Sequence, residues 1–383
     1  MSASAVVIGG GAVGLAFAAA AKDLEVTVLE GAPASPAADP PEYDLRVFAL
    51  SPGTKAFLSA IGAWQRLPAD RLAPVRRMQV RGASAGEGLD FDAPAGRELA
   101  WIVEGNRLRR ALAEAALARG AHVVHGNRPV SLEATADGAN VGLQGGSTLF
   151  AELAIGSDGA DSWTRGRLGL ASTLKRYPET AVVAHFRCEK PTGGIARQWF
   201  RHDGILAWLP LPGDRMSIVW SARGGLAEEL AALDGESLAR RVRDAGGAAL
   251  GDLAPDSASA AFPLRLIRVP RIAVPGAVLV GDAAHGVHPL AGQGVNLGFQ
   301  DAACLAATLA ARSPLERPGD LAVLRRHERA RRADTDAMQW LTDRLEWLFG
   351  LESPAVERLR EAGLAGVGRL PLARRLLAAH AMR

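Results

Sequence analysis

Short apolar runs alternate with glycine-rich and polar stretches at the start of the chain. Residues Ala5 to Ile8 form one apolar run, small residues fill the segment from Ala16 to Ala21, and a second apolar run extends from Val26 to Leu29. Apolar runs on either side of a helical segment are typical of buried parallel strands. The pattern therefore predicts a strand, a helix and a parallel strand, the opening unit of a doubly wound sheet.

Helical and strand patterns continue after this unit. The segment Asn106 to Arg119 places Leu108, Leu112 and Ala115 on one face at helical spacing. An apolar run from Val278 to Val280 predicts a late return to the buried parallel sheet, followed by helices. Three further strand-like runs lie at Val123–His125, Val141–Leu143 and Leu153–Ile155.

The pattern changes between Ala181 and Ala222 to short runs rich in Val, Trp, Phe and Ile, separated by turn signals. Such runs favour an antiparallel sheet, which we expect to form a second lobe. The predicted fold class is α/β, with an inserted antiparallel-sheet domain and a helical C-terminal region. The α/β domain is predicted at 1–75, 102–178 and 270–312, the antiparallel-sheet domain at 76–101 and 179–269, and the helical region at 313–383.

Composition excludes several classes of protein. The 383 residues are 48% hydrophobic and 22% charged, which suits a globular chain with ample apolar surface to bury. The 44 basic residues nearly balance the 41 acidic ones, so we expect no nucleic-acid partner. Cys188 and Cys304 belong to no metal-ligand or disulfide spacing, and no apolar run is long enough to span a membrane. A cytoplasmic location is therefore expected.

The first chemical motif is the glycine turn Gly9-x-Gly11-x-x-Gly14, between a predicted strand and a predicted helix. At this spacing the first glycine permits a tight turn, the second lets a pyrophosphate approach, and the third allows helix and strand to pack closely. Glu30 closes the second strand, where a carboxylate can accept hydrogen bonds from an adenosine ribose. The alternatives are purely structural glycines and a solvated charge at the strand end.

The second motif begins with Gly281-Asp282 directly after the late strand and leads to Gly292-Gln-Gly294. A carboxylate at this place is available to a polyol such as the flavin ribitol, and the glycine turn opens a helix whose free N–H groups favour an anion. His285 and His288 are spaced as two metal ligands would be, but no third ligand lies nearby, so we predict no metal site.

Together these motifs resemble, in order and spacing, the fingerprints of the para-hydroxybenzoate-hydroxylase-like FAD monooxygenases. The middle fingerprint is Gly156-Ser-Asp158-Gly159. Within that class the chain is most similar to the ubiquinone-biosynthesis hydroxylases, the UbiH-like group, over nearly its whole length. The resemblance implies a Rossmann-like FAD-binding domain with an inserted substrate domain.

The resemblance also implies roles for individual residues. Glu30 would hold the adenosine ribose, Asp282 the ribitol, and Asp158 would brace the pyrophosphate region. A salt bridge is the alternative role for Arg46 and for Arg107. The implied cofactor-binding set is Gly9, Gly11, Ala12, Gly14, Glu30, Arg46, Arg107, Val130, Asp158, Asp282, Gly292, Gly294, Val295 and Asn296. The implied catalytic set, facing the reactive edge of the flavin, is Pro289, Gly292, Gly294 and Asn296.

The activity implied is hydroxylation of a phenolic, prenylated ring through a flavin C4a-hydroperoxide. NADH or NADPH would be the electron donor and dioxygen the co-substrate. Aromatic side chains on the antiparallel strands are candidates for the wall of an apolar substrate pocket, with core packing as the alternative. These substrate-binding candidates are Trp199, Trp208 and Trp220.

Two other functions remain open: a flavin-dependent reductase or dehydrogenase of an isoprenoid substrate, and a non-catalytic FAD-bound subunit of a biosynthetic complex. The segment from Ala355 to Arg383 is rich in arginine and leucine. Such a segment suits peripheral contact with the inner membrane or with a biosynthetic complex, although an ordinary solvated helix would have the same composition.

Overall fold

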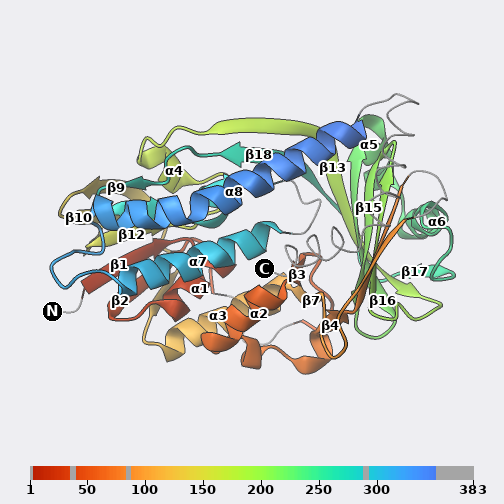
Figure 1. Cartoon of the computed structure of the whole chain (residues 1–383), viewed down its shortest axis with the longest axis horizontal. Coiled ribbons are helices and arrows are strands. Elements are labelled where there is room, and N and C mark those ends of the chain that lie inside the picture. The colour runs from red at the N-terminus through yellow and green to blue at the C-terminus, as the bar shows by residue number, and fades with distance from the viewer. Residues whose placement is uncertain (1–2, 35–39, 83–87, 288–292, 351–383) are drawn as a thin grey trace.

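The computed structural model describes residues 3–34, 40–82, 88–287 and 293–350, and it has two main parts (Figure 1). One part is a six-stranded sheet whose neighbouring strands are parallel except for the edge pair β19–β20. Its order is β19 (Ala273–Val274), β20 (Ala277–Leu279), β12 (Leu153–Gly156), β1 (Ala3–Ile8), β2 (Leu24–Glu30) and β8 (His122–His125).

Side chains of β1 alternate between two cores because successive residues of a strand point to opposite faces. Val7 packs with helices on one face, whereas Val6 packs with a small antiparallel sheet on the other. The helices are α1 (Ala12–Ala20), α3 (Gly105–Ala118) and α7 (Gly294–Ala310). The small sheet consists of β9 (Pro129–Thr135), β10 (Gly138–Leu143) and β11 (Thr148–Ala151). The predicted α/β fold with a Rossmann-like parallel sheet is confirmed, but a small antiparallel sheet covers the face where a doubly wound sheet would carry further helices.

The second part is a nine-stranded sheet that is antiparallel except where β14 pairs with β5 in parallel. Helices α5 (Gly224–Ala232) and α6 (Gly235–Ala245) pack on its outer face. Its strands are β5 (Arg77–Arg81), β6 (Leu89–Asp92), β13 (Thr173–Cys188), β14 (Ile195–Arg201), β15 (Gly204–Leu211), β16 (Arg215–Arg223), β17 (Leu253–Pro255), β18 (Ala260–Arg268) and β21 (His285–Gly286).

Strand β13 begins at Thr173, before the predicted start of the sheet domain at residue 179, and β21 adds two residues from beyond residue 269. The large sheet therefore includes residues on both sides of the range 179–269 that the amino-acid pattern predicts for it. The proposed domain boundaries themselves stay a prediction.

Smaller elements fill the junction between the two parts. A three-stranded sheet of β3 (Val47–Leu50), β7 (Ala100–Glu104) and β4 (Ala73–Val75) lies there with α2 (Pro52–Ala60), and α4 (Trp163–Arg167) follows β12. Short 3-10 turns occur at Trp64–Arg66, Ala69–Arg71 and Gly281–Ala283.

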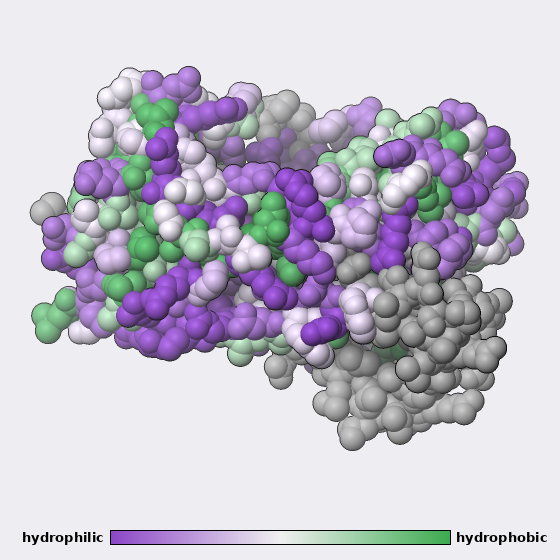
Figure 2. Space-filling view, turned by 90° about the horizontal axis from the view of Figure 1, so that it is seen from above, coloured by the Kyte–Doolittle hydropathy of each residue, from purple (hydrophilic) through white to green (hydrophobic). Residues whose placement is uncertain are grey.

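Helix α8 (Leu321–Gly350) runs along the top of the molecule in Figure 1, from the parallel sheet to the second lobe. Figure 2 looks down on this face, which is largely hydrophilic with scattered hydrophobic residues. None of the helices in the described ranges combines the length and apolar character that a bilayer crossing requires.

Candidate cofactor site

The glycine turn after β1 has the geometry that its spacing predicts. Gly9 has φ +108°, and a Cβ there would lie 2.6 Å from the carbonyl oxygen of Ser157. A Cβ on Gly14 would collide with Ser157 Oγ and with the Gly9 carbonyl oxygen. At Gly11, the N-cap of α1, a Cβ would meet nothing within 4 Å. The outer glycines therefore permit close packing, and the middle one leaves open space before the helix N-terminus, as a pyrophosphate requires.

The Glu30 carboxylate lies beside this turn at the end of β2. One of its oxygens accepts a hydrogen bond from the Gly10 amide at 3.1 Å, and the other accepts from the Ala32 amide at 2.8 Å. The side chain is half-buried. These contacts fix the carboxylate at the place predicted for the ribose-binding acid, and each oxygen keeps acceptor capacity for a further donor.

The second turn, which carries Asp282, lies directly against the first. Gly281 has φ +60°, and a Cβ there would lie 3.2 Å from Val13 Cγ2. A Cβ on Gly298, in the second turn of α7, would lie 2.5 Å from the same atom. Val13 stands between Gly11 and Gly14, so a single side chain joins the two motifs although about 270 residues separate them. A shared dinucleotide site requires this proximity.

The electrostatic setting of Asp282 suits a carboxylate that binds hydroxyl groups. Its side chain is exposed, yet surrounding protein raises its pKa above the usual range, while His285, Arg46 and Arg265 act in the opposite direction. Water reaches the carboxylate and these cationic groups lie near it, so Asp282 is ionised near neutral pH.

Helix α7 begins at Gly294 as predicted, with Gln293 as its N-cap and no side-chain cap. Asn296, however, is fully buried and already bonded: its Oδ1 accepts from the Ser51 amide (3.1 Å) and from Thr54 Oγ1 (2.7 Å), and its Nδ2 donates to the Ala49 carbonyl. The side chain of Asn296 thus anchors the helix N-terminus to β3 and α2. The catalytic and cofactor-binding roles expected at this position stay predictions.

Other predicted residues of this motif are only partly placed. Gly294 and Val295 are half-buried in the first turn of α7, at the N-terminus that would face an anion. Pro289, Gly292 and His288 lie outside the described residues.

The two predicted arginines have different surroundings. Arg46 is exposed and close enough to Asp282 to lower the pKa of that carboxyl. Arg107 lies mostly inside the protein, where its Nε donates to Glu104 Oε2 at 2.9 Å and Arg71 binds the same carboxylate at 2.8 Å. The salt-bridge alternative for Arg107 is therefore present, but inside the protein rather than on its surface.

Asp158 lies beside the glycine turn, whereas Val130 lies on the small antiparallel sheet. The Asp158 carboxylate accepts from Ser162 Oγ at 2.5 Å and from the Thr164 amide at 2.8 Å, which holds the segment after β12 against Gly9. Val130 is exposed on β9, and its carbonyl accepts a long hydrogen bond of 3.4 Å from Arg167. A cofactor role for either residue stays a prediction.

The three tryptophans do not line the space between the lobes. Trp208 and Trp220 are 1% exposed and pack in one hydrophobic cluster with α5 and α6, and Trp199 contacts that cluster with its ring 4.8 Å from the Trp208 ring. They lie on the outer face of the sheet, because Leu209 on the other face packs with the small sheet at the junction. Their predicted contact with substrate is corrected to core packing.

One residue close to the site was not predicted. Asp301 is the only charged residue in α7, and it is 1% exposed. An isolated acid in an otherwise small and apolar helix is the sequence signal that could have marked it, since a buried charge needs partners.

Known proteins resemble the chain over nearly its full length. The protein family described as "FAD binding domain" matches residues 2–339. "Ubiquinone hydroxylase UbiL" of Rhodospirillum rubrum is 34% identical over 99% of this chain and 89% of the relative. "3-demethoxyubiquinol 3-hydroxylase" of Escherichia coli is 32% identical over 96% of this chain and 95% of the relative. "Ubiquinone biosynthesis monooxygenase COQ6, mitochondrial" of Homo sapiens is 30% identical over 97% and 91%.

Solved structures agree with this at the level of the fold. PqsL of Pseudomonas aeruginosa has a TM-score of 0.79 at 23% identity and covers 95% of this chain and 99% of that one. HpxO of Klebsiella pneumoniae, in complex with FAD, has a TM-score of 0.77 at 18% identity over 99% and 98%. By its sequence, its fold and the paired turns around Val13, the chain belongs to the FAD-binding family that includes the ubiquinone-biosynthesis hydroxylases.

Proposed function

We propose that this protein is an FAD-dependent monooxygenase that hydroxylates a phenolic, prenylated ring in ubiquinone biosynthesis. The observation that carries the proposal is the contact of Val13 with both Gly281 and Gly298, which brings the two halves of an FAD site together. The names of the relatives support the pathway, because three of them are hydroxylases or monooxygenases of ubiquinone or its biosynthesis.

The residues present fit FAD. The open space at Gly11 and the α1 N-terminus suit the pyrophosphate, Glu30 suits the adenosine ribose, and Asp282 suits the ribitol. When bound, FAD supplies the oxygen-activating redox chemistry, with NADH or NADPH as electron donor and dioxygen as co-substrate.

The contribution of the chain itself is positioning and electrostatics. Helix α7 starts at Gly294 without a side-chain cap, and a helix N-terminus favours negative charge placed before it. Asn296 keeps this terminus fixed through its bonds to Ser51 and Thr54. A preorganised terminus does not have to reorient during reaction, which is where its advantage over water lies.

The wall of the substrate pocket is proposed on the inner face of the large sheet. Four neighbouring strands each contribute one residue to a row across this face: Val183, Val219, Ala207 and Gln198. The last three are only half-buried. All four lie on the sheet face opposite to the one that α5 and α6 cover, because neighbouring residues of these strands pack with the two helices. A small, mostly apolar surface of this kind suits a flat ring with a hydrocarbon tail.

We further propose peripheral contact with the inner membrane or a biosynthetic complex from the cytoplasmic side. The support is compositional: arginines and leucines interleave between 355 and 383, outside the described residues. An apolar substrate would be reached most directly from a membrane surface.

The test is to purify the protein, record its visible spectrum and follow donor oxidation with and without a prenylphenol. We expect a yellow protein, faster donor oxidation with the phenol, and one atom of labelled dioxygen in the product. Donor oxidation without label in the product would favour an isoprenoid reductase or dehydrogenase. Stoichiometric FAD without donor oxidation under any phenol would favour a non-catalytic subunit.

A further inference from the structure

A buried carboxylate connects the Asp282 turn to two helices. Asp301 Oδ2 accepts hydrogen bonds from the Gly281 amide at 2.9 Å and from His285 Nε2 at 2.6 Å, while Oδ1 accepts from Arg331 Nε at 2.8 Å. Hydrogen bonds to a charged acceptor are about twice as strong as neutral ones. One side chain therefore fixes the backbone just before Asp282, the ring just after it, and the neighbouring helix α8.

The contact at Gly281 has a specific conformational effect. Gly281 adopts the left-handed conformation with φ +60°, where the chain leaves β20 and turns toward Asp282. Its amide has no strand partner in this turn and bonds to Asp301 instead. The direction in which Asp282 leaves the sheet thus depends on a residue 20 positions later in the sequence.

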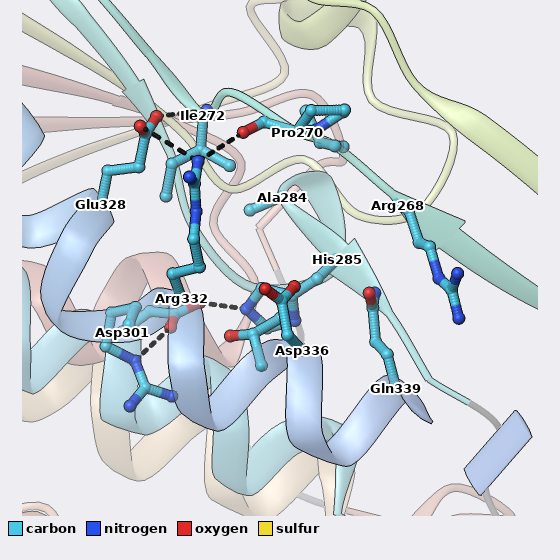
Figure 3. Close-up of a pocket in the computed structure, with 13 residues that line it drawn as sticks. Arg268, Pro270, Ile272, Ala284, His285, Asp301, Glu328, Arg332, Asp336 and Gln339 are labelled. Atoms are coloured by element: carbon cyan, nitrogen blue, oxygen red, sulfur yellow. Dashed lines mark hydrogen bonds and ion pairs between the residues drawn. The ribbon is translucent and has the colours of Figure 1, made fainter. Parts of the chain in front are cut away.

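Asp301 and His285 also border a cavity, which Figure 3 shows between α8 and the strands that lead into the turn. It has a volume of about 310 Å³ and lies on the side of His285 that faces α8. Protons can therefore exchange with this ring from the cavity. The charged groups around the cavity and the ring are Asp282, Asp301, Arg331, Arg268, Glu328, Arg332 and Asp336, and the titratable His327 is near Asp301.

The charges in this cluster support one another. Burial opposes a charged imidazole at His285, but the adjacent Asp301 carboxylate outweighs it and raises the pKa of His285 above its usual range. Burial likewise acts to raise the pKa of Asp301, yet His285 and Arg331 hold it well below its usual range. A protonated His285 in turn lowers the pKa of Asp282, so it favours the ionised carboxylate on the cofactor side.

We propose that Asp301 is a positioning residue for FAD, which holds the Gly281 turn by its backbone amide and the His285 ring by its side chain, so that an ionised Asp282 is presented to the cofactor. The positive charge of a protonated His285 favours the ionised form of Asp282. Arg331, on α8, binds the Asp301 carboxylate and holds it in place. The inference rests on the FAD binding within the proposed function, but not on the hydroxylation or its substrate.

A purely structural salt bridge is the competing explanation, and three variants separate it from positioning. Asp301→Asn removes the charge from the cluster at constant size. Asp334→Asn is the matched control, because Asp334 also binds Arg331, at 2.9 Å, but is exposed and contacts neither Gly281 nor His285. His285→Gln keeps a donor for Asp301 and removes the titration.

The experiment is titration of the apoprotein with FAD alone, followed by flavin fluorescence, between pH 6 and pH 9 as an approximate range around the histidine value. Asp301→Asn should weaken FAD binding on the order of tenfold to a hundredfold, while Asp334→Asn stays within about twofold of the wild type. The hydrogen bond from His285 to Asp301 weakens when the imidazole loses its charge, so wild-type affinity should fall as pH rises through the pKa of His285, and His285→Gln should flatten that profile.

Two results would overturn the proposal: wild-type FAD affinity in a folded Asp301→Asn variant, or an unchanged pH profile in His285→Gln. If Asp301→Asn does not fold, the His285→Gln profile decides alone. No substrate is present in this titration, so failure of the hydroxylase proposal would show in turnover and leave these affinities unaffected.

Discussion

Val13 on α1 and Gly298 on α7 touch so closely that a methyl group added at Gly298 would lie 2.5 Å from Val13 Cγ2. Real side chains do not approach to that distance, so the glycine is required for the two helices to pack. Since α1 begins at one cofactor turn and α7 follows the other, this helix contact sets the distance between the turns.

Replacing Gly298 with Ala should therefore separate the two turns. We expect a loss of stability of about 1–3 kcal/mol, the usual cost of overpacking, together with weaker FAD binding, measured by urea unfolding and FAD titration. Val13→Ala in the same chain should restore most of both, because it removes the colliding methyl groups. Gly166→Ala is the control, since a Cβ there would meet nothing within 4 Å. A Gly298→Ala variant as stable as the control would refute the packing argument.

Asp282→Ala should sharply lower flavin occupancy with the fold largely intact, because the exposed carboxylate has no part in a buried core. Occupancy is read from the ratio of visible to ultraviolet absorbance, and folding from circular dichroism. Asp161→Ala is a suitable control: Asp161 is a nearby exposed acid that pairs with Arg265. Equal occupancy in the two variants would show that the ribitol contact has been assigned to the wrong residue.

Glu30→Ala should weaken FAD binding by on the order of 1–3 kcal/mol, the usual effect of a lost hydrogen bond to a charged group. The structure adds a complication, because Glu30 also accepts from the Gly10 and Ala32 amides and so shapes the turn. Glu30→Gln keeps one acceptor oxygen for these amides and should bind FAD with intermediate affinity. If FAD affinity were unaltered in both variants, Glu30 would only stabilise the turn through the Gly10 and Ala32 amides and would not bind the cofactor.

His327 should make the protein sensitive to acid. Its ring is fully buried, neither nitrogen has a hydrogen-bond partner among the described residues, and burial lowers its pKa to about 4. The unfolded chain binds a proton near pH 6.5 and the folded one only near pH 4. Its contribution is therefore fully present above about pH 6.5 and is lost as pH falls toward 4, by roughly 3 kcal/mol.

His327→Leu should remove this part of the acid sensitivity and also relieve the two unpaired nitrogens, so its melting temperature at pH 5 should exceed that of the wild type. The difference between the two proteins should narrow at pH 8. A wild type and a variant that lose stability in parallel on acidification would mean that His327 already has a partner for its proton.

Local pattern was sufficient for the parallel sheet and its glycine turn. The apolar runs around Gly9 and Gly14 leave few alternatives, and Glu30 lies where the motif places it because strand length and turn fix its position. Asp301 could not be assigned in this way. Its partners Gly281 and Arg331 lie 20 and 30 residues away, and only the tertiary packing of α7 and α8 brings them together.

The surroundings of the tryptophans and of the Asn296 side chain could not be predicted from the sequence for a related reason. Both faces of the large sheet carry apolar residues, so alternation along β15 does not tell which face α5 and α6 will cover. Trp208 is on the covered face, and its smaller neighbour Ala207 is on the other. For Asn296, a glycine-rich motif predicts exposure to a ligand, but Ser51 and Thr54, from far earlier in the chain, already use its amide.

Helix α8 is 30 residues long, about 45 Å at 1.5 Å per residue. Toward its start Arg331 is tied to Asp301 beneath the cofactor turn, and toward its end Asp343 is tied to Lys175 on the large sheet. The helix thus connects the two lobes through side-chain ion pairs at both positions. A movement that separates the lobes would break at least one of these ion pairs.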